Sequence, residues 1–391
     1  MKRPKLVALF FGATLFMQSA AHAATNLKIG FLTTLSGPGA VIGQEMKDGF
    51  MLGIKHSGNK LGGLPVDLQI ADDQQSPDAA RQVVDRFIKR DNVDLMTGVV
   101  FSNVLLPILP TVLASETIYV SANTGPADYA GAKCNRNFFS VASQNEDIPQ
   151  AVGKFAVEKK YGRMALIAPN YPGGRELING FKRQYKGEVV EELYSRLGQL
   201  DFASELATLR AAKPDAIYFF LPGGMGVNFI KQFEASGMAN QVALLAPGFS
   251  ADEDTIKAVG DAVVGVYNGS QWAADLPNPA NEKFVADFQK TYGRMPTLYA
   301  SQSYDAALLI DSAVSSVDGR IEDRDALRAA LRKANFKSVR GPFRFNNNQY
   351  PIHNLYLRVV QKGSDGKIAN KLVGTMLTDH ADSFAASCPM K

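Results

Sequence analysis

The sequence Leu95-Met-Thr-Gly-Val-Val-Phe-Ser-Asn-Val-Leu-Leu-Pro107 decides how the chain folds. Residues 93–100 form an apolar run that is typical of a buried strand, and the run ends at Phe101-Ser102. The residues after Ser102 follow a helical periodicity, with Pro107 in the early turns. The stretch therefore predicts a strand, a short loop at Ser102 and a helix, which together form one unit of an α/β sheet.

Ser102 has two candidate roles at this position. A serine between a strand and a helix most often caps the helix by accepting a backbone N–H. The same position lies beside the unpaired N–H groups of the first helical turn, which favour an anion such as a carboxylate. Spacing alone favours the cap, and it leaves the ligand-binding role open.

The start of the chain predicts a secretory signal peptide over residues 1–23. It combines a basic start at residues 2–5, an apolar run over residues 6–17 and the small-x-small pattern Ala21-His22-Ala23. The apolar run is too short to cross a bilayer about 30 Å thick. We therefore expect export to the periplasm, with cleavage near Ala23-Ala24.

The length and charge of the chain limit the classes of function. With 391 residues, of which 46% are hydrophobic, the chain can form two domains that each bury a core. Removal of the leader, which carries three basic and no acidic residues, lowers the formal net charge from +4 to +1. No basic stripe with interleaved aromatic residues occurs, so nucleic-acid binding has no support.

Cys134 and Cys388 are the only cysteines in the sequence. In an exported chain such a pair favours one disulfide over a metal site, which needs more ligands than two cysteines and scattered histidines supply. The disulfide would tie the C-terminal tail to the first third of the chain. His56 and His353 have no partner at metal-ligand spacing and are expected on the surface. No metal and no cofactor is predicted.

Strand-like and helix-like segments alternate through the chain, which predicts an α/β fold with two doubly wound parallel-sheet lobes. The expected ranges are 24–140 and 275–340 for lobe 1, 141–270 and 345–378 for lobe 2, and 379–391 for a C-terminal tail. Three crossovers would join the lobes, and Trp272 in the second is interpreted as a packing anchor. A cleft between the lobes would be lined by loops at the carboxyl ends of strands, where open α/β sheets bind ligands.

Two polar motifs near the N-terminus favour turns over chemistry. In the loop 34–43, Gly37 and Gly39 are followed by Gly43, one residue too late for a dinucleotide-binding fingerprint. Asp72-Asp73 follows a predicted strand without a third carboxylate nearby, and Asp is a favoured turn residue. A metal or acid–base pair is therefore the weaker interpretation.

With these residues in view, the chain resembles the exported binding proteins of branched-chain-amino-acid-type transporters, a type I periplasmic binding protein family. The likeness covers essentially the whole mature chain. Six segments carry it in order: Ile29-Gly-Phe with 35–43, Gly62-Gly63, Asp72-Asp73 with Pro77, Gly98 to Ser102, Ser121 to Pro126, and Asn170-Tyr171 with Gly174-Arg175. The resemblance implies a monomer that closes around a ligand and is recognised by an inner-membrane ATP-driven (ABC) permease.

The resemblance also implies where a ligand binds. The family's ligand carboxylate is held by the serine that matches Ser102 and by loop amides that match Asn123 to Gly125. The candidate ligand-binding residues are Ile42, Phe101, Ser102, Asn123, Thr124, Gly125, Tyr171, Pro222, Phe249 and Tyr299.

The chain departs from the family pattern at two positions. Amino-acid binders of the family have an acidic residue for the ligand's ammonium where this chain has Gly248, and an aromatic residue where it has Ile42. The predicted ligand is therefore a small aromatic or otherwise apolar monocarboxylate, such as a benzoate or a phenylpropenoate. A branched-chain amino acid or an amide remains the alternative.

Other classes of function were compared with this prediction. An enzyme such as a doubly wound hydrolase or dehydrogenase would need a nucleophile with a base or a cofactor loop, and neither pattern is present. A ligand-sensing protein that works with a separate receptor remains open. The sequence thus favours a non-catalytic solute-binding protein that works by hinge closure.

We expect the mature protein to begin at Ala24, because Ala21 and Ala23 supply the small residues that signal processing requires. Mass spectrometry of the exported protein measures this directly. An intact leader on the exported chain would contradict the prediction.

Overall fold

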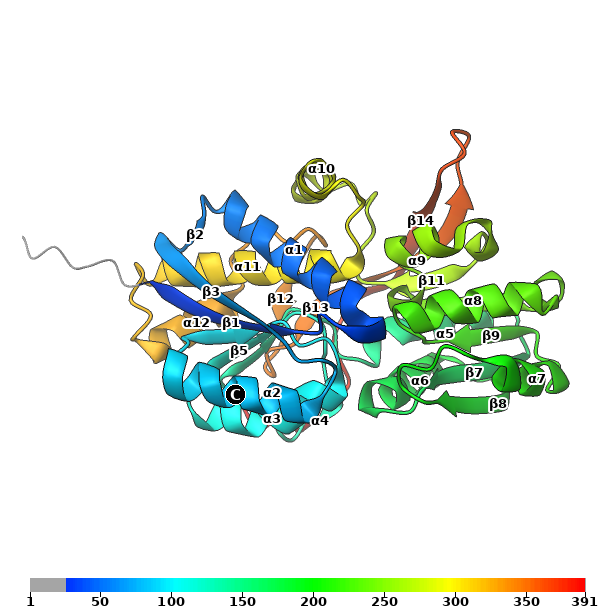
Figure 1. Ribbon diagram of the computed structural model, residues 1–391, viewed down its shortest axis with the longest axis horizontal. Helices are drawn as coiled ribbons and strands as arrows, with labels where there is room; N and C mark the ends of the chain where they lie inside the picture. Colours follow the sequence, from blue (N-terminus) through cyan, green and yellow to red (C-terminus); the bar gives the residue numbers. More distant parts are fainter. Residues whose placement is uncertain (1–25, 391) are drawn as a thin grey trace, which may run out of the picture.

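The computed structural model describes residues 26–390, so the predicted signal peptide and the first two residues of the expected mature chain lie outside the described residues. The chain forms two α/β lobes side by side (Figure 1). Within the described range no helix is both long and apolar enough to span a membrane. The predicted fold class is therefore confirmed.

The first lobe is built from two separate parts of the chain. Its sheet has the strand order β2-β3-β1-β4-β5-β6, and α10 to α12 return to pack against it. The elements are β1 (Leu27–Thr33), α1 (Ala40–His56), β2 (Lys60–Leu61), β3 (Leu64–Asp72), α2 (Pro77–Arg86), β4 (Leu95–Thr97), α3 (Ser102–Ala114), β5 (Ile118–Ser121), α4 (Ala127–Ala130), β6 (Phe138–Ser140), α10 (Pro279–Tyr292), α11 (Leu298–Ser316) and α12 (Arg324–Lys333).

The second lobe contains the larger sheet, with the order β12-β13-β11-β10-β9-β7-β8 and β14 paired to β13. Strands β7 to β11 are parallel, and the C-terminal hairpin β13–β14 is antiparallel. The elements are α5 (Asp147–Glu158), β7 (Arg163–Pro169), α6 (Pro172–Gln184), β8 (Glu188–Ser195), α7 (Ala203–Ala211), β9 (Ala216–Phe219), α8 (Gly224–Ala235), β10 (Ala243–Pro247), α9 (Glu253–Val259), β11 (Tyr267–Ser270), β12 (Arg344–Phe345), β13 (Pro351–Lys362) and β14 (Ile368–His380).

The strand order reverses once within the parallel part of each sheet. In the first lobe the chain passes from β1 to β3 on one side and then to β4 on the other, so β1 and β4 are neighbours. In the second lobe it passes from β7 to β8 and then to β9, so β7 and β9 are neighbours. The loops after such neighbouring strands diverge to opposite faces and leave a crevice, where open α/β sheets bind ligands.

Strand β4 is shorter than the apolar run predicts. It ends at Thr97, because Gly98 has φ +104°, a conformation that L side chains rarely adopt. A Cβ at Gly98 would lie 2.8 Å from the Leu32 carbonyl oxygen of the neighbouring strand. The chain therefore leaves the sheet early, and Val99 to Phe101 form a buried segment that leads into α3.

Three crossovers connect the lobes, and Arg340 joins two of them. It is buried in the third crossover, where its Nε donates to Asp305 on α11 at 2.9 Å and its Nη1 donates to the Val141 carbonyl of the first crossover at 2.7 Å. In the second crossover Trp272 is fully buried, and its indole N–H donates to Asn281 at 2.7 Å. The packing role predicted for Trp272 is confirmed.

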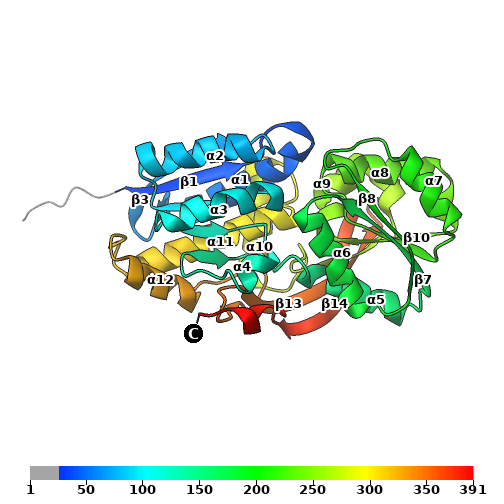
Figure 2. The same cartoon turned by 90° about the horizontal axis from the view of Figure 1, so that it is seen from below.

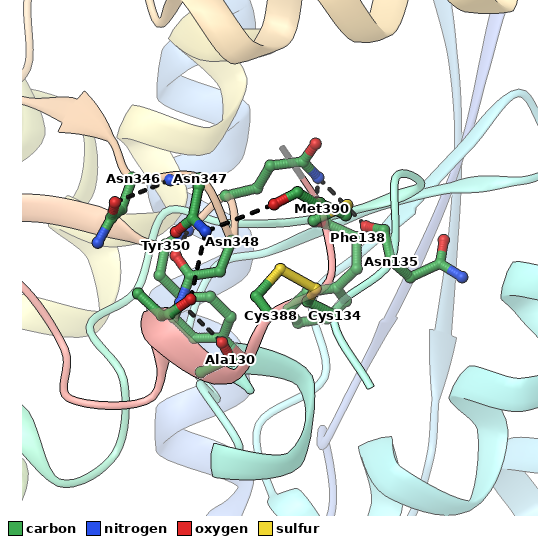
Figure 3. Close-up of a disulfide and its surroundings, with 12 residues drawn as sticks. Ala130, Cys134, Asn135, Phe138, Asn346, Asn347, Asn348, Tyr350, Cys388 and Met390 are labelled. Carbon is green, nitrogen blue, oxygen red and sulfur yellow. Dashed lines mark hydrogen bonds between the residues drawn. A yellow bond between two sulfur atoms is a disulfide. The ribbon is translucent and has the colours of Figure 1, made fainter. Parts of the chain in front are cut away.

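The C-terminal tail and the third crossover are both fastened to the first lobe. Cys134 and Cys388 form the predicted disulfide, with Cα atoms 5.6 Å apart. Beside it, Asn348 donates to the Ala130 carbonyl at 2.8 Å and Gln349 donates to the Phe138 carbonyl at 2.6 Å (Figure 3). Figure 2 shows the C-terminal tail, drawn in red, under the first lobe and next to β13.

One expectation about the C-terminal region was wrong. His353 is buried rather than on the surface, and its Nε2 lies 3.0 Å from the Ser143 hydroxyl. The cause is that β13 begins beside the first crossover, so the start of this strand packs against Ser143. Strand β14 ends at His380, next to the expected start of the tail at residue 379.

Replacement of either Cys134 or Cys388 by serine should lower the free energy of unfolding by roughly 2–4 kcal/mol, because the bond closes a loop of about 250 residues. Denaturant titration under non-reducing conditions measures the change. The double variant is the internal control, since both single variants break the same bond and should match it. Single variants as stable as the unaltered protein would contradict this prediction.

Candidate ligand-binding site

A narrow cavity of about 30 Å³ lies between the two lobes. This volume holds only about two waters, so a ring-sized ligand requires the side chains that line the cavity to move apart. The residues that line it are Ile42, Val100, Phe101, Ser102, Asn123, Thr124, Asn145, Tyr171, Gly173, Leu177, Phe220, Pro222, Phe249 and Tyr299. The cavity thus brings together every residue of the predicted set except Gly125.

Most of the lining residues come from the two places where strand order reverses. Ile42 lies on α1 after β1, and Ser102 begins α3 after β4. Tyr171 follows β7 and Pro222 follows β9 in the facing lobe. The crevice of each sheet therefore opens toward the other, and the cavity is where they meet.

Ser102 does not cap a helix, so the commoner interpretation of its position was wrong. It is the first residue of α3, and the N-cap residue is Phe101. The Ser102 hydroxyl oxygen instead accepts an N–H from the Asn145 side chain at 3.3 Å. Because the oxygen accepts this bond, the hydroxyl proton remains available to a ligand acceptor in the cavity.

Asn145 is a functional candidate that the sequence analysis missed. Its Oδ1 accepts the backbone N–H of Gly125 at 2.9 Å, which fixes the amide orientation because a backbone N–H can only donate. Its Nδ2 therefore faces Ser102 and the carboxyl of Glu176, which is 2.6 Å away. Asn145 lies in the first crossover, so only the tertiary arrangement brings it to Ser102.

The loop after β5 contributes one free hydroxyl. Thr124 is 4% exposed, lines the cavity, and its Oγ1 has no hydrogen-bond partner among the described residues. A buried polar atom without a partner is costly, so this hydroxyl is ready for a polar ligand atom. Asn123 has a different role, since its Nδ2 donates to the Val100 carbonyl at 2.7 Å and holds the loop to the end of β4.

Gly125 does not line the cavity, although the family resemblance pointed to its amide. Its N–H already donates to Asn145 Oδ1, and this hydrogen bond orients the Asn145 side chain. A side chain at Gly125 would place Cβ 2.2 Å from the Ser143 carbonyl oxygen. The position therefore requires glycine for close backbone packing.

Two helix N-termini meet at Ser102. Helix α3 starts there, and α6 of the other lobe starts at Pro172, with α3 and α6 in contact (Figure 2). A Cβ on Gly173 would lie 3.0 Å from the Ser102 Oγ and also 3.0 Å from Cζ of Tyr171. The small residue thus leaves space beside the hydroxyl, at a point where the peptide dipoles of both helices favour negative charge.

The remainder of the cavity wall is aromatic or aliphatic. Ring centroids are 6.2 Å apart for Phe101 and Tyr171, 6.4 Å for Tyr171 and Phe220, and 6.3 Å for Phe220 and Phe249. Phe249 lies 5.5 Å from Tyr299. These rings form a connected aromatic wall that continues from one lobe to the other.

Direct contacts hold the lobes close together around the cavity. The Tyr299 hydroxyl on α11 donates to the Phe249 carbonyl of the second lobe at 3.0 Å. A Cβ on Gly223, at the start of α8, would lie 2.9 Å from the Pro38 carbonyl oxygen of the first lobe. The conformation is therefore one in which the lobes touch on the rim of the cavity.

The cavity lining carries no charged side chain. Gly248 precedes Phe249 but does not line the cavity. A Cβ on Gly248 would lie 2.8 Å from Nη2 of the buried Arg358. Asp252 accepts the backbone N–H of Thr255 at the start of α9, and Glu253 accepts from Asn370 at 3.0 Å. Both carboxyls are engaged in these hydrogen bonds, and neither residue lines the cavity.

The other candidates for chemistry have structural roles. Asp73 accepts from the Thr34 hydroxyl at 2.7 Å and from the Gln75 N–H at 2.8 Å, and Asp72 accepts from the N–H groups of Leu35 and Gln74. The turn interpretation of this pair is confirmed. No group of three or more potential metal ligands occurs among the described residues.

Comparison with known proteins identifies the family. A family model described as "Periplasmic binding protein" matches residues 26–367. Among curated proteins, "Leu/Ile/Val-binding protein homolog 6" of Brucella melitensis is 25% identical over 382 residues, which is 95% of this chain and 97% of the relative.

Solved structures give the same result. An ABC transporter solute-binding protein from R. palustris in complex with benzoate is 31% identical, with a TM-score of 0.88 over 94% of this chain and 100% of its own. A solute-binding protein of an ABC transporter from Rhodopseudomonas palustris BisB5 in complex with 3,4-dihydroxybenzoic acid is 26% identical, with a TM-score of 0.86 over 92% and 99%. The chain therefore belongs to the periplasmic binding protein family, and it is a solute-binding protein of an ABC transporter.

Proposed function

We propose that this protein captures a small aromatic or otherwise apolar monocarboxylate between its lobes and presents it to the permease. One observation carries the proposal: the cavity combines hydrogen-bond donors at one end with an aromatic wall, and no charged side chain lines it. The donor end consists of the Ser102 and Thr124 hydroxyls, beside the two helix N-termini. Asn145 orients this end, since its amide N–H groups donate to Ser102 and Glu176. Such an end suits a carboxylate, and the wall suits a ring.

Electrostatics favours this ligand class over amino acids. Burial of an ammonium group without a carboxylate partner costs several kcal/mol, which is enough to remove micromolar affinity. An aromatic carboxylate carries only a negative charge, and the hydroxyl groups of the donor end can donate hydrogen bonds to it. The structural relatives in complex with benzoate and 3,4-dihydroxybenzoic acid support the same class.

A branched-chain amino acid is the second candidate, because the curated relatives bear the name Leu/Ile/Val-binding protein. These relatives are about 25% identical, and Gly248 stands where the family's amino-acid binders have an acidic residue. If the protein delivered its ligand to a sensor rather than to a transporter, it would use the same cavity. The ligand class is therefore the property to test first.

The ligand would contact groups of both lobes, and these contacts would favour lobe closure. Ser102 and Thr124 belong to the first lobe, whereas Phe220 and Phe249 belong to the second. A ligand that touches both lobes stabilises the closed state over the open state by its additional contacts. The Tyr299 to Phe249 hydrogen bond would form in the closed state and close the cavity behind the ring.

Benzoate should stabilise the protein against heat, and leucine should give a much smaller shift, because only the amino acid must bury an unpaired ammonium. A thermal-shift screen of aromatic acids and aliphatic amino acids, followed by calorimetry, measures this. Stabilisation by leucine or valine with none by any aromatic acid would overturn the proposed function.

Ser102→Ala should weaken benzoate binding about tenfold to hundredfold, because a hydrogen bond to a charged group is worth about 1.5–3 kcal/mol. The melting temperature without ligand should change little, since the hydroxyl caps no helix. Ser76→Ala is the matched control: Ser76 caps α2, so this variant should lose about 1 kcal/mol of stability and keep its affinity. The reverse pattern for the two serines would contradict the role of Ser102.

A further inference from the structure

Glu176 lies directly behind the donor end of the cavity. It is on α6 of the second lobe, and its Oε2 accepts from Asn145 Nδ2 at 2.6 Å. The same Asn145 nitrogen lies 3.3 Å from the Ser102 hydroxyl oxygen. One amide group therefore separates the Glu176 carboxyl from the hydroxyl proposed to hold the ligand.

Glu176 also joins the lobes. Its Oε1 accepts the backbone N–H of Ala127, at the start of α4 in the first lobe, at 3.2 Å. With Asn145 in the first crossover, this carboxyl bridges α6, α4 and the hinge. Any change in its charge acts at once on the donor end and on the contact between the lobes.

The surroundings of Glu176 make its charged form unfavourable. Burial raises the pKa of this carboxyl to about 7, the hydrogen bonds from Asn145 and Ala127 oppose the shift, and the negative charges of Glu146 and Asp128 add to it. Arg183 partly offsets Glu146, and Lys133 partly offsets Asp128. The other titratable groups that face Glu176 are the hydroxyls of Tyr171 and Tyr350.

We propose that Glu176 is a positioning residue that couples carboxylate capture to uptake of one proton, an inference that rests on the proposed function. A ligand carboxylate bound at Ser102 would bring a second negative charge close to Glu176 with little water between them. Like charges at short range in a buried site disfavour double ionisation, so one group takes a proton. The proton comes from solvent and stays on Glu176 while the ligand is bound.

The sign of the pH dependence follows from this arrangement. The bound ligand raises the pKa of Glu176 further, so the complex holds more protons than the free protein. Affinity is therefore fully present below about pH 7 and falls as the pH rises through the free and bound pKa values of Glu176. A benzoate-type carboxylic acid, with a pKa of about 4, stays ionised throughout this range.

Other groups in the protein titrate in the same range and must be separated from Glu176. Burial raises the pKa of Glu45 to about 7 and that of Asp252 to about 8. Glu45 is bound to Arg294 and Thr297, and Asp252 caps α9, so neither contacts the donor end. A variant of Glu176 distinguishes its contribution from theirs.

The test is isothermal calorimetry of benzoate binding from pH 6 to pH 9, in two buffers with different ionisation enthalpies. The expected result for the unaltered protein is affinity about tenfold weaker at pH 9 than at pH 6, with measurable proton uptake between them. Glu176→Gln removes the titrating group and should give a nearly flat profile without uptake. Glu188→Gln is the control, since Glu188 is an exposed partner of Arg163 in the same lobe and should leave the profile unchanged.

Each outcome decides a different point. Benzoate binding with a flat profile in the unaltered protein, or a slope that persists in Glu176→Gln, overturns the role of Glu176 and leaves the proposed function standing. Binding of no aromatic carboxylate at any pH overturns the proposed function itself. Leucine binding that strengthens with pH and disappears in Glu176→Gln overturns both, because Glu176 would then be the partner of an ammonium. The proton-uptake measurement needs no variant, so it stands even if Glu176→Gln fails to fold.

Discussion

Reversal of strand order in a parallel sheet forces two neighbouring loops apart, and this chain contains two such reversals that face each other. The loops after β1 and β4 open toward those after β7 and β9. Three crossovers hold the sheets in this orientation. Most of the cavity lining follows from that one topological constraint, because each sheet alone would offer only part of it.

Buried polar contacts help to hold the crossovers in place. Arg340 connects the third crossover to Asp305 and to the first crossover, and both charged groups are fully shielded from water. Loss of one partner from such a pair typically costs about 3–5 kcal/mol. The tail and its disulfide add a second fastening at Asn348 and Gln349. Motion between the lobes must therefore pivot about a hinge whose position is fixed.

Local patterns predicted the parts of the site that lie on regular elements, and they failed where function depends on tertiary contact. Ser102 follows an apolar strand and is predicted from that order, whereas Tyr171 is suggested by the family resemblance. Asn145 was missed because it lies in a crossover, and Leu177 and Phe220 were missed because a cavity wall has the same apolar pattern as a core. The cap interpretation of Ser102 was wrong because α3 begins one residue earlier than spacing suggests.

Trp272 has a consequence for how this protein can be observed. It is the sole tryptophan of the sequence, it lies in the second crossover, and hydrogen bonds from its indole and backbone N–H groups hold it in place. Its ring packs against Phe284 on α10, with centroids 6.2 Å apart. Ultraviolet emission excited at the tryptophan band therefore originates from a single, rigidly held fluorophore at the hinge. The protein therefore carries a built-in optical reporter of hinge bending.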